Sequence, residues 1–355
     1  MSLGGRMSTF HRLKISKITQ LTPDSVALGL ELPEELQEQF RFIPGQHVIV
    51  RAKIDGRQVR RTYSFCSAPG EPLRLAVRRI EGGVFSGFVN KILKAGDRLD
   101  VSEPLGTFRL APEEGQHYVG IAAGSGITPI LSMIRSTLNQ TQTGRFHLLY
   151  GNRDKAHTMF FDELAGLKDR YVNRLSLDLF FSQQAVDIPL LAGRITGDRL
   201  ARIYQAMWAQ EPPDGYYLCG PKAMVDDCRE TLLALGVNAG DIHSELFFAE
   251  ETAPVQRAHK GPAQAKIKII NDGRTFEIDY REEHGSLLDA ALSAGLDVSY
   301  ACKGGVCATC RAKVVEGRAD MGTNYGLEPE EIKAGFILTC QSRPVSKTLT
   351  LSYDE

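Results

Sequence analysis

The sequence predicts a multidomain chain: an antiparallel β-barrel, then a doubly wound α/β domain, then an α+β domain. Three observations predict this order. The first hundred or so residues read as short strands broken by turns, strands alternate with helices from His117 onward, and the C-terminal part carries four of the seven cysteines. The length of 355 residues suits two or three domains. The predicted boundaries are 7–112, 113–249, an exposed linker at 250–265, and 266–355.

The barrel is predicted from alternating apolar segments and turn signals. Residues 26–32 alternate, and Asp55-Gly56 is a hairpin signal before the strand at 59–64. One helix is expected at 86–94, where a serine starts it and Gly96 follows its end. Many short strands with a single helix favour a closed antiparallel barrel.

The α/β domain is predicted from an apolar run at 118–123, which is typical of a buried parallel strand. Gly124-Ser-Gly-Ile-Thr-Pro129 follows it, and Thr128 is expected to cap the next helix with Pro129 at its first position. Strands and helices then alternate to Gly236. The strands are expected at 146–150, 175–181 and 216–219, and the helices at 160–168, 198–207 and 221–235.

The last domain opens with strands on either side of Asn271-Asp-Gly273 and a helix begun by Ser286. Residues 300–310 then space three cysteines as C-x4-C-x2-C, and a fourth follows thirty residues later. This is the thiolate pattern of a plant-type [2Fe-2S] cluster. Glycines in the loop allow the backbone to turn close to inorganic sulfur and to donate N–H groups to it. The predicted iron ligands are Cys302, Cys307, Cys310 and Cys340.

Two alternatives for these cysteines are a disulfide framework and a structural zinc site. The first needs an oxidising compartment, and the second prefers paired C-x2-C knuckles, of which the chain has one. No stretch is apolar enough to span a bilayer, and no signal peptide is evident. A formal net charge of −1 argues against nucleic acid or an anionic membrane as a partner. The cysteines left over, Cys66, Cys219 and Cys228, fit a reducing cytoplasm.

A candidate flavin site begins with Arg61-Thr62-Tyr63-Ser64 at the end of a barrel strand. A flavin needs an aromatic side chain against its ring, a hydroxyl near the ring edge and a cation on its phosphates, and this tetrapeptide offers all three. The alternative is a chance strand with an edge arginine. Gly83 and Ser86 follow, where a glycine turn feeds a helix start and thus a pyrophosphate site.

A candidate nucleotide site is Gly124 to Pro129, which lacks the third glycine of the dinucleotide fingerprint but still lies between a strand and a helix start. The alternative is a plain strand-to-helix turn. Cys219-Gly220-Pro221 ends the last predicted strand, and carboxyl ends of strands line the ligand crevice of such sheets. The alternative for Cys219 is a small buried apolar side chain.

Taken together, these motifs resemble the ferredoxin–NADP reductase superfamily, in the branch with a C-terminal plant-type ferredoxin domain. Within that branch they are most similar to reductase subunits of phenylacetyl-CoA epoxidases. The resemblance covers nearly the whole chain after Met7 and is carried by residues 42–47, 121–129, 150–153, 300–310 and 321–329. It implies a β-grasp ferredoxin fold, FAD rather than FMN, and NADPH or NADH as electron donor. It also implies an oxygenase component of di-iron or Rieske type as electron acceptor. Within the resemblance, the expected acceptor is the di-iron phenylacetyl-CoA epoxidase of aerobic phenylacetate degradation.

The resemblance also implies roles for matching positions. For FAD, it assigns Arg61, Tyr63 and Ser64 to the flavin ring and phosphate, Gly83 and Ser86 to the pyrophosphate, and Phe247 to the second flavin face. For the nicotinamide nucleotide, it assigns Gly124, Gly126, Thr128 and Pro129, with Cys219, Gly220 and Pro221 on the nicotinamide side. For the cluster, it assigns Cys302 and Cys307 to one iron, and Cys310 and Cys340 to the other.

Arg153, just past the second strand of the α/β domain, is a candidate for the 2′-phosphate of NADPH, so NADPH is the expected donor and NADH is possible. The alternative is an arginine on a solvated loop. No Ser-His-Asp or paired-carboxylate pattern suggests another reaction, so no catalytic side chain is predicted. Two other functions stay open. One is the reductase of another aromatic hydroxylase or dioxygenase, and the other is a redox-sensing electron carrier.

Overall fold

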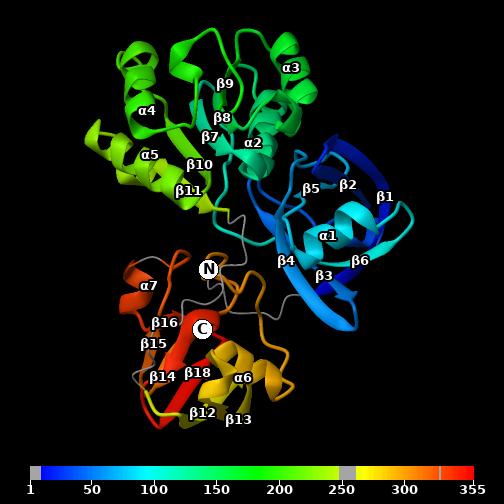
Figure 1. Ribbon diagram of the computed structural model, residues 1–355, viewed down its shortest axis with the longest axis vertical. Coiled ribbons are helices and arrows are strands. Elements are labelled where there is room, and N and C mark those ends of the chain that lie inside the picture. Colours follow the sequence, from blue (N-terminus) through cyan, green and yellow to red (C-terminus); the bar gives the residue numbers. More distant parts are fainter. Residues whose placement is uncertain (1–8, 248–260, 328) are drawn as a thin grey trace. The chain divides into compact units, whose positions relative to one another are not determined.

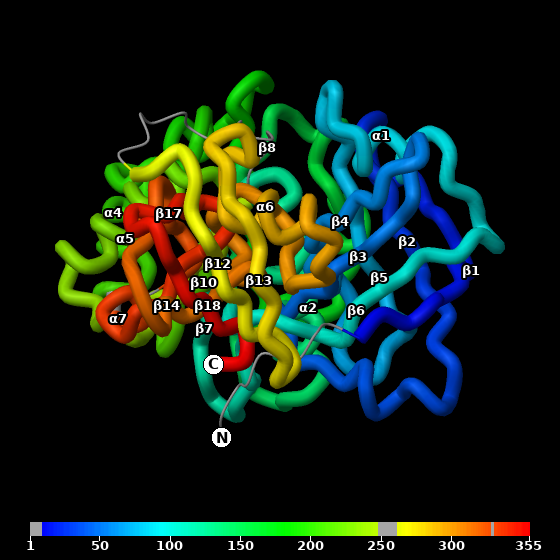
Figure 2. Tube along the Cα trace, turned by 90° about the horizontal axis from the view of Figure 1, so that it is seen from below, coloured from blue at the N-terminus to red at the C-terminus, as the bar shows by residue number. Residues whose placement is uncertain are grey.

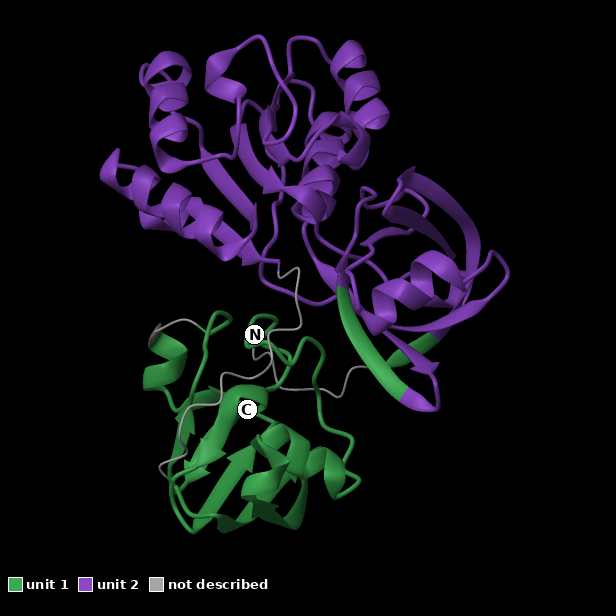
Figure 3. Ribbon diagram, in the orientation of Figure 1, with its two compact units in different colours: residues 1–11, 58–62, 251–355 green, residues 12–57, 63–250 purple. Residues whose placement is uncertain are grey.

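The computed structural model describes residues 9–247, 261–327 and 329–355 (Figure 1). The chain divides into two compact units (Figure 3). Unit 2 comprises residues 12–57 and 63–250, and unit 1 comprises residues 1–11, 58–62 and 251–355. No helix among the described residues is long and apolar enough to cross a membrane.

The N-terminal strands form one antiparallel sheet of six strands in the order β4-β3-β6-β1-β2-β5. An isolated bridge between Phe65 and Leu75 joins the two ends of this sheet, so the sheet closes on itself. The barrel prediction is therefore confirmed, and its single α-helix is α1 (Val84–Lys91). The strands are β1 (Phe10–Thr22), β2 (Ser25–Glu31), β3 (His47–Ile54), β4 (Arg57–Ser64), β5 (Arg74–Arg78) and β6 (Arg98–Ser102).

The second part of unit 2 is a parallel sheet of five strands in the order β11-β10-β7-β8-β9. This order confirms the doubly wound α/β prediction, with the reversal of strand order between β7 and β10. The strands are β7 (His117–Ala123), β8 (Arg145–Asn152), β9 (Leu175–Phe181), β10 (Gly215–Gly220) and β11 (Ile242–Leu246). The helices are α2 (Ile127–Gln140), α3 (Phe161–Arg170), α4 (Gly197–Ile203) and α5 (Lys222–Ala234).

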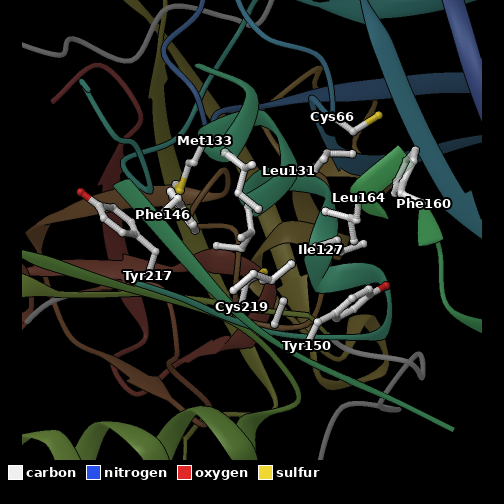
Figure 4. Close-up of a cluster of buried hydrophobic side chains, with 14 of the residues drawn as sticks. Cys66, Ile127, Leu131, Met133, Phe146, Tyr150, Phe160, Leu164, Tyr217 and Cys219 are labelled. Atoms are coloured by element: carbon white, nitrogen blue, oxygen red, sulfur yellow. The ribbon is translucent and has the colours of Figure 1, made fainter. Parts of the chain in front are cut away.

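Helices cover both faces of this sheet, and they bury the apolar side chains that β7 carries on each side. Val119 and Ile121 pack in a cluster with residues of α4 and α5, and Tyr118 and Ala122 pack in another with residues of α2 and α3. Figure 4 shows part of the second cluster. The helix expected at 198–207 is present as the α-helix α4 followed directly by a π-helical turn at Tyr204–Trp208, in which the ring of Trp208 is buried.

The start of α2 differs from the sequence prediction. A 3-10 turn at Gly124–Gly126 runs directly into the helix, so Gly126 is the N-cap and Thr128 lies in the first turn. The left-handed backbone of Gly124, with φ of 55°, lets the chain turn immediately after β7. Thr128 donates its hydroxyl to the Ser125 carbonyl at 3.1 Å instead of capping the helix. Pro129 is tolerated because the first four N–H groups of a helix have no partner inside it.

Unit 1 contains a mixed sheet in the order β13-β12-β18-β14-β16 and a separate pair of strands, β15 and β17. The β12–β13 hairpin (Figure 2) turns at Asp272 and Gly273, both with positive φ, as its Asn-Asp-Gly sequence predicts. The strands are β12 (Gln264–Asn271), β13 (Arg274–Arg281), β14 (Arg311–Glu316), β15 (Ala319–Met321), β16 (Phe336–Leu338), β17 (Ser342–Pro344) and β18 (Thr348–Ser352). The helices are α6 (Leu287–Ser293), capped by Ser286, and α7 (Pro329–Lys333).

The predicted linker at 250–265 falls only partly within the described residues. Residues 250–260 lie outside them, and β12 begins at Gln264, inside the predicted linker. Strand β12 therefore overlaps the last two residues of the predicted linker, since residues from Gln264 pair with β13.

Candidate functional site

In unit 1, the four cysteines predicted as iron ligands stand as two thiol pairs. Cys307 donates to Cys302, and Cys310 donates to Cys340. The N–H groups of Gly304 and Cys307 lie 3.3 and 3.5 Å from the Cys302 sulfur. The hydrogen bond with the Cys307 thiol, together with these N–H groups, outweighs burial and lowers the pKa of Cys302 below its ordinary value. The same pairing raises the pKa values of Cys307 and Cys310, so each thiol pair shares its protons, and all four sulfurs would bind iron as thiolates.

The pairing fits a two-iron cluster better than a single metal ion. Among residues 9–247, 261–327 and 329–355, no three His, Cys, Asp or Glu side chains stand where one ion would be shared. A structural zinc ion needs four ligands around one centre, whereas a [2Fe-2S] cluster takes two thiolates on each iron. Two thiol pairs therefore match the donor set that such a cluster requires.

A neighbouring segment, residues 322–327, supports the loop that carries these cysteines. A Cβ on Gly326 would lie 2.4 Å from the Val306 carbonyl oxygen, so glycine permits a close backbone contact there. The Asn324 side chain accepts from the Leu327 N–H at 2.9 Å and donates to the Leu327 carbonyl at 2.9 Å. These contacts fix a segment that the cysteine spacing alone did not single out.

Gln341 is a second residue that the sequence reasoning missed. Its Nε2 donates to the Lys303 carbonyl at 2.8 Å and lies 3.7 Å from the Cys340 sulfur. Its position directly after a predicted ligand was the available signal. The side chain joins the two ends of the cysteine pattern.

The predicted flavin residues occupy the end of β4 and the start of α1. Ser64 is buried, and the ring of Tyr63 lies 5.7 Å from the ring of Phe85 on α1. The structure thus brings Tyr63 against Phe85 in the first turn of α1, the turn that follows Gly83 and contains Ser86. Arg61 and Thr62 precede Tyr63 on the same strand, and Arg61 Nη1 donates to the Arg60 carbonyl at 2.8 Å.

No side chain caps the start of α1, which leaves its first backbone N–H groups available to a phosphate. Gly83 is the N-cap and makes no side-chain cap, and a Cβ there would lie 2.5 Å from Ser86 Oγ. Ser86 Oγ accepts from the Ile80 N–H at 3.1 Å and donates to the Gly83 carbonyl at 3.4 Å. The serine therefore shapes the turn, and the helix start offers backbone N–H groups to an anion.

The predicted nucleotide residues meet where the strand order of the parallel sheet reverses. A Cβ on Gly126 would lie 2.2 Å from the carbonyl oxygen of Cys219. Gly124 to Pro129 and Cys219 to Pro221 are thus neighbours at the carboxyl ends of β7 and β10. This edge of a doubly wound sheet is where ligands bind. The Tyr150 hydroxyl, missed from the sequence, holds the turn by donating to the Gly124 carbonyl at 2.9 Å.

Cys219 itself is fully buried, and Figure 4 shows its side chain within the apolar cluster. Burial, and then the nearby Glu245 carboxylate, raise the pKa of this thiol well above its ordinary value. The Cys219 side chain therefore packs as a small buried apolar group, the alternative named from the sequence, and its backbone carbonyl faces Gly126. Phe247 follows β11 and donates its N–H to the Gly220 carbonyl at 3.0 Å.

Glu245 is another residue that the sequence reasoning missed. Its Oε1 lies 3.4 Å from His47 Nδ1 of the barrel, and its buried Oε2 finds no hydrogen-bond partner among the described residues. Strand β11 pairs Glu245 with Cys219 in register. The structure therefore places a carboxylate beside the end of β10, which strand patterning did not predict.

Arg153, predicted to meet a 2′-phosphate, is already paired with a carboxylate. Its Nη2 lies 3.0 Å from Oδ2 of Asp24 in the barrel. The next residue, Asp154, is used locally, since it accepts from the N–H and ring of His157. Neither Asp24 nor its second arginine partner, Arg78, was singled out from the sequence, because their contacts are tertiary.

Three family profiles match the chain in the order of its domains. They are an oxidoreductase FAD-binding domain at residues 12–110, an oxidoreductase NAD-binding domain at 121–230, and a 2Fe-2S iron–sulfur cluster binding domain at 269–345. The chain is 42% identical over 352 residues to one component of the 1,2-phenylacetyl-CoA epoxidase of Escherichia coli (strain K12), covering 98% of this chain and 99% of that protein.

Two further relatives cover nearly the whole chain. The ferredoxin reductase component of 3-ketosteroid-9-alpha-monooxygenase from Rhodococcus rhodochrous is 31% identical over 96% of both chains. Among solved structures, phthalate dioxygenase reductase aligns with a TM-score of 0.60 and 26% identity, over 97% of this chain and 98% of that one. That protein is described as a modular structure for electron transfer from pyridine nucleotides to [2Fe-2S].

The chain is thus an NAD(P)H-dependent oxidoreductase that uses FAD, a [2Fe-2S] cluster and a nicotinamide nucleotide. It belongs to the ferredoxin–NADP reductase superfamily, in the branch that ends in a plant-type [2Fe-2S] domain, and serves as an electron-transfer component.

Proposed function

We propose that this reductase passes electrons from NADPH or NADH to the di-iron oxygenase component of a phenylacetyl-CoA epoxidase in aerobic phenylacetate degradation. The observation that carries the proposal is the 42% identity, over 98% of the chain, to a protein named as a component of that epoxidase. When bound, NAD(P)H supplies a hydride, FAD accepts the electron pair, and the [2Fe-2S] cluster carries one electron at a time.

The side chains of this protein bind and orient in the proposal, and none is assigned a proton transfer. The bare start of α1 at Gly83 and Ser86, and the residues Arg61, Thr62, Tyr63 and Ser64 of β4, would hold FAD. The flavin's second face would be covered by Phe247. The nucleotide would lie against Gly124, Gly126, Thr128, Pro129, Cys219, Gly220, Pro221 and Arg153, at the carboxyl edge of the parallel sheet.

The proposed cluster ligands are Cys302 and Cys307 on one iron and Cys310 and Cys340 on the other, which agrees with the two thiol pairs. The proposed domains are residues 7–112, 113–249 and 266–355, and a linker at 250–265 connects the second domain to the third. The cytoplasm is the proposed location, because the further free thiols Cys66, Cys219 and Cys228 suit a reducing compartment.

A Cys307→Ser variant tests the order of electron flow. NADPH-driven reduction of ferricyanide, a small acceptor that takes electrons from the flavin, should persist, whereas electron delivery to the oxygenase should fall to background. Iron content and the visible spectrum of the variant establish that the cluster is lost while FAD is retained. Loss of both activities with FAD still bound would contradict separate flavin and cluster stages.

Reconstitution tests the proposed partner. The purified reductase should support oxygen-dependent turnover of phenylacetyl-CoA by the di-iron component of a phenylacetyl-CoA epoxidase. The second candidate is an oxygenase of another kind, favoured by the 31% identity to a monooxygenase reductase component. Turnover with a Rieske-type oxygenase, and none with the di-iron component, would select that candidate.

A further inference from the structure

Asp24 is held rigidly in the turn between β1 and β2 of the barrel. Thr22 Oγ1 donates to Asp24 Oδ1 at 2.7 Å, and the Asp24 carbonyl accepts from the Arg79 N–H at 2.7 Å. The Thr22 and Ser25 hydroxyls, 2.6 Å apart, close the same turn. The side chain of Asp24 is mostly buried, with 18% of it exposed. One carboxylate oxygen, Oδ2, is left to face the α/β domain of the same unit.

That oxygen binds two arginines from different parts of unit 2. Arg78 Nε, at the end of β5, lies 3.2 Å from Oδ2, and Arg153 Nη2, just after β8, lies 3.0 Å from it. Arg78 is mostly buried, whereas the Arg153 side chain is 46% exposed. Asp24 thus links the barrel to the carboxyl edge of the nucleotide sheet through two guanidinium groups.

The two arginines lie toward different parts of a dinucleotide. Nη1 of Arg78 lies 2.9 Å from the position that a Cβ on Gly124 would take, so this guanidinium stands over the turn after β7. Such a turn faces the pyrophosphate, which NADH and NADPH share. Arg153 follows β8, the neighbouring strand, and a guanidinium there suits the 2′-phosphate that only NADPH carries.

We propose that Asp24 sets the nucleotide preference of this reductase, as a resident counter-ion that occupies Arg153 and disfavours the 2′-phosphate of NADPH. The inference rests on the proposed function and concerns the same nucleotide site. With Asp24 ionised, the two arginines and one carboxylate carry a net charge of +1 rather than +2. A 2′-phosphate brings close to two negative charges, so the carboxylate repels it, whereas it does not repel the uncharged 2′-hydroxyl of NADH.

The carboxylate is ionised in the folded chain. Burial would raise the pKa of Asp24, but the Thr22 hydroxyl and the two arginines together hold it below its ordinary value. The ion pair is therefore present at neutral pH, where the nucleotide binds. The chain should consequently accept NADH as well as NADPH.

Binding of two adenosine nucleotides to the FAD- and cluster-loaded protein tests this proposal directly. Adenosine 2′,5′-bisphosphate and 5′-AMP differ only in the 2′-phosphate, so the ratio of their dissociation constants isolates that group. In Asp24→Asn, the preference for the bisphosphate should rise by roughly three- to ten-fold, as expected for loss of one partly exposed charge. A fall in that preference would mean that Asp24 orients Arg153 for phosphate, and an unchanged ratio would mean that Asp24 has no role; either result overturns the proposal.

Controls separate the charge of Asp24 from its place in the turn. Asp24→Ser removes the charge but leaves a hydroxyl for Thr22, and it should shift the ratio in the same direction. With Arg153→Gln in the background, Asp24→Asn should change the ratio much less. Asp100→Asn breaks a comparable pair with Arg51, 3.1 Å apart within the barrel sheet, and should leave the ratio unchanged.

Activity distinguishes failure of this inference from failure of the proposed function. If the wild-type protein reduces ferricyanide with neither NADH nor NADPH, the proposed function fails. If turnover is normal and the ratio of dissociation constants is the same in wild type and Asp24→Asn, only the role proposed for Asp24 fails.

Discussion

Two regions, the cluster loop at residues 300–310 and the proposed nucleotide crevice at the carboxyl ends of β7, β8 and β10, differ in how far apart along the chain their contacting residues lie. In the loop, N–H groups of Gly304 and Cys307 reach a sulfur two and five residues away. In the crevice, Gly126 faces the Cys219 carbonyl, and Arg153 pairs with an aspartate 129 residues away. Spacing along the sequence therefore describes the loop well and describes the crevice only in part.

This difference predicts different sensitivities to substitution. A loop built from near neighbours can move as one piece and keep its local geometry. The crevice depends on strands and turns that are fixed by the whole of unit 2, so a small steric change there has to be absorbed by packed elements. Substitutions of glycines in the two regions compare these responses.

The largest effect is expected for Gly126→Ala. Its φ of −61° suits alanine, so the cost is steric and comes from a methyl group 2.2 Å from the Cys219 carbonyl oxygen. Both backbone segments are buried, and we expect the free energy of unfolding to fall by about 3 kcal/mol, with a clear loss of 5′-AMP binding. Urea unfolding and calorimetric titration measure the two. In Gly166→Ala, on α3, a Cβ meets nothing within 4 Å, and stability should rise by about 0.5 kcal/mol.

A smaller effect is expected for Gly326→Ala beside the cluster loop. The added methyl group would lie 2.4 Å from the Val306 carbonyl oxygen, but both partners belong to loops rather than to the ends of packed strands. We expect a loss of about 1–2 kcal/mol and a changed visible spectrum of the bound cluster, with iron content retained. Gly322→Ala is the matched control, since the nearest atom is Gln341 O at 3.6 Å. If Gly326→Ala proves as costly as Gly126→Ala, the contrast between the two regions is wrong.

The parts of the molecule that were predictable are those that local rules govern. The Asn271-Asp-Gly273 hairpin, the Ser286 cap and the C-x4-C-x2-C loop each depend on neighbouring residues. The order of barrel, α/β and ferredoxin domains was predicted from the change in the pattern of strands and helices along the chain, and it is confirmed. The predicted cofactors, FAD, a nicotinamide nucleotide and a [2Fe-2S] cluster, are confirmed as well.

The parts that were missed depend on contacts between distant segments. Asp24 looks like a turn residue in its own hairpin, and only the fold brings it to Arg153. Tyr150 looks like one more apolar residue of a buried strand, although its hydroxyl supports Gly124. Thr128 was wrongly predicted as a cap because propensity favours threonine there, whereas the helix has Gly126 as its N-cap, two residues earlier.

A third test concerns a network of charges that joins the barrel to α2 and α3 within unit 2. Arg135 Nη2 and Nε bind Glu71 at 2.6 and 2.9 Å, and Arg135 Nη1 binds Glu163 at 2.6 Å. Glu163 also receives two bonds from Arg74, at 2.7 and 2.9 Å. Burial would raise the pKa of Glu71, but the Arg135 hydrogen bonds, the Ala68 N–H and the positive charges of Arg135 and Arg74 lower it below 4.5.

Glu71→Gln should therefore lower the free energy of unfolding by about 1 kcal/mol at pH 7. Because the folded pKa of Glu71 is depressed, its contribution is present above pH 4.5 and is lost as the pH falls through the folded pKa. The difference between wild type and variant should shrink progressively as the pH falls below 4.5, and urea unfolding at several pH values measures it. Glu31→Gln, which breaks an exposed pair with Lys14, should change little at any pH. A pH-independent difference would show that lost packing, not charge, is responsible.

The smallest effect is expected for Gln341→Leu, which removes a donor near the cluster sulfurs together with its bond to the Lys303 carbonyl. The Gln341 amide lies 3.7 Å from the Cys340 sulfur, and donors near such sulfurs stabilise the reduced, more negative cluster. We expect the reduction potential to fall by roughly 20–60 mV, which corresponds to about one weak hydrogen bond in a one-electron couple. Redox titration followed by electron paramagnetic resonance measures it without the oxygenase. Gln341→Glu, which adds a negative charge at the same place, should lower the potential further. If Gln341→Leu leaves the potential unchanged, the amide serves only its bond to the Lys303 carbonyl, and the potential depends on the N–H groups of the loop itself.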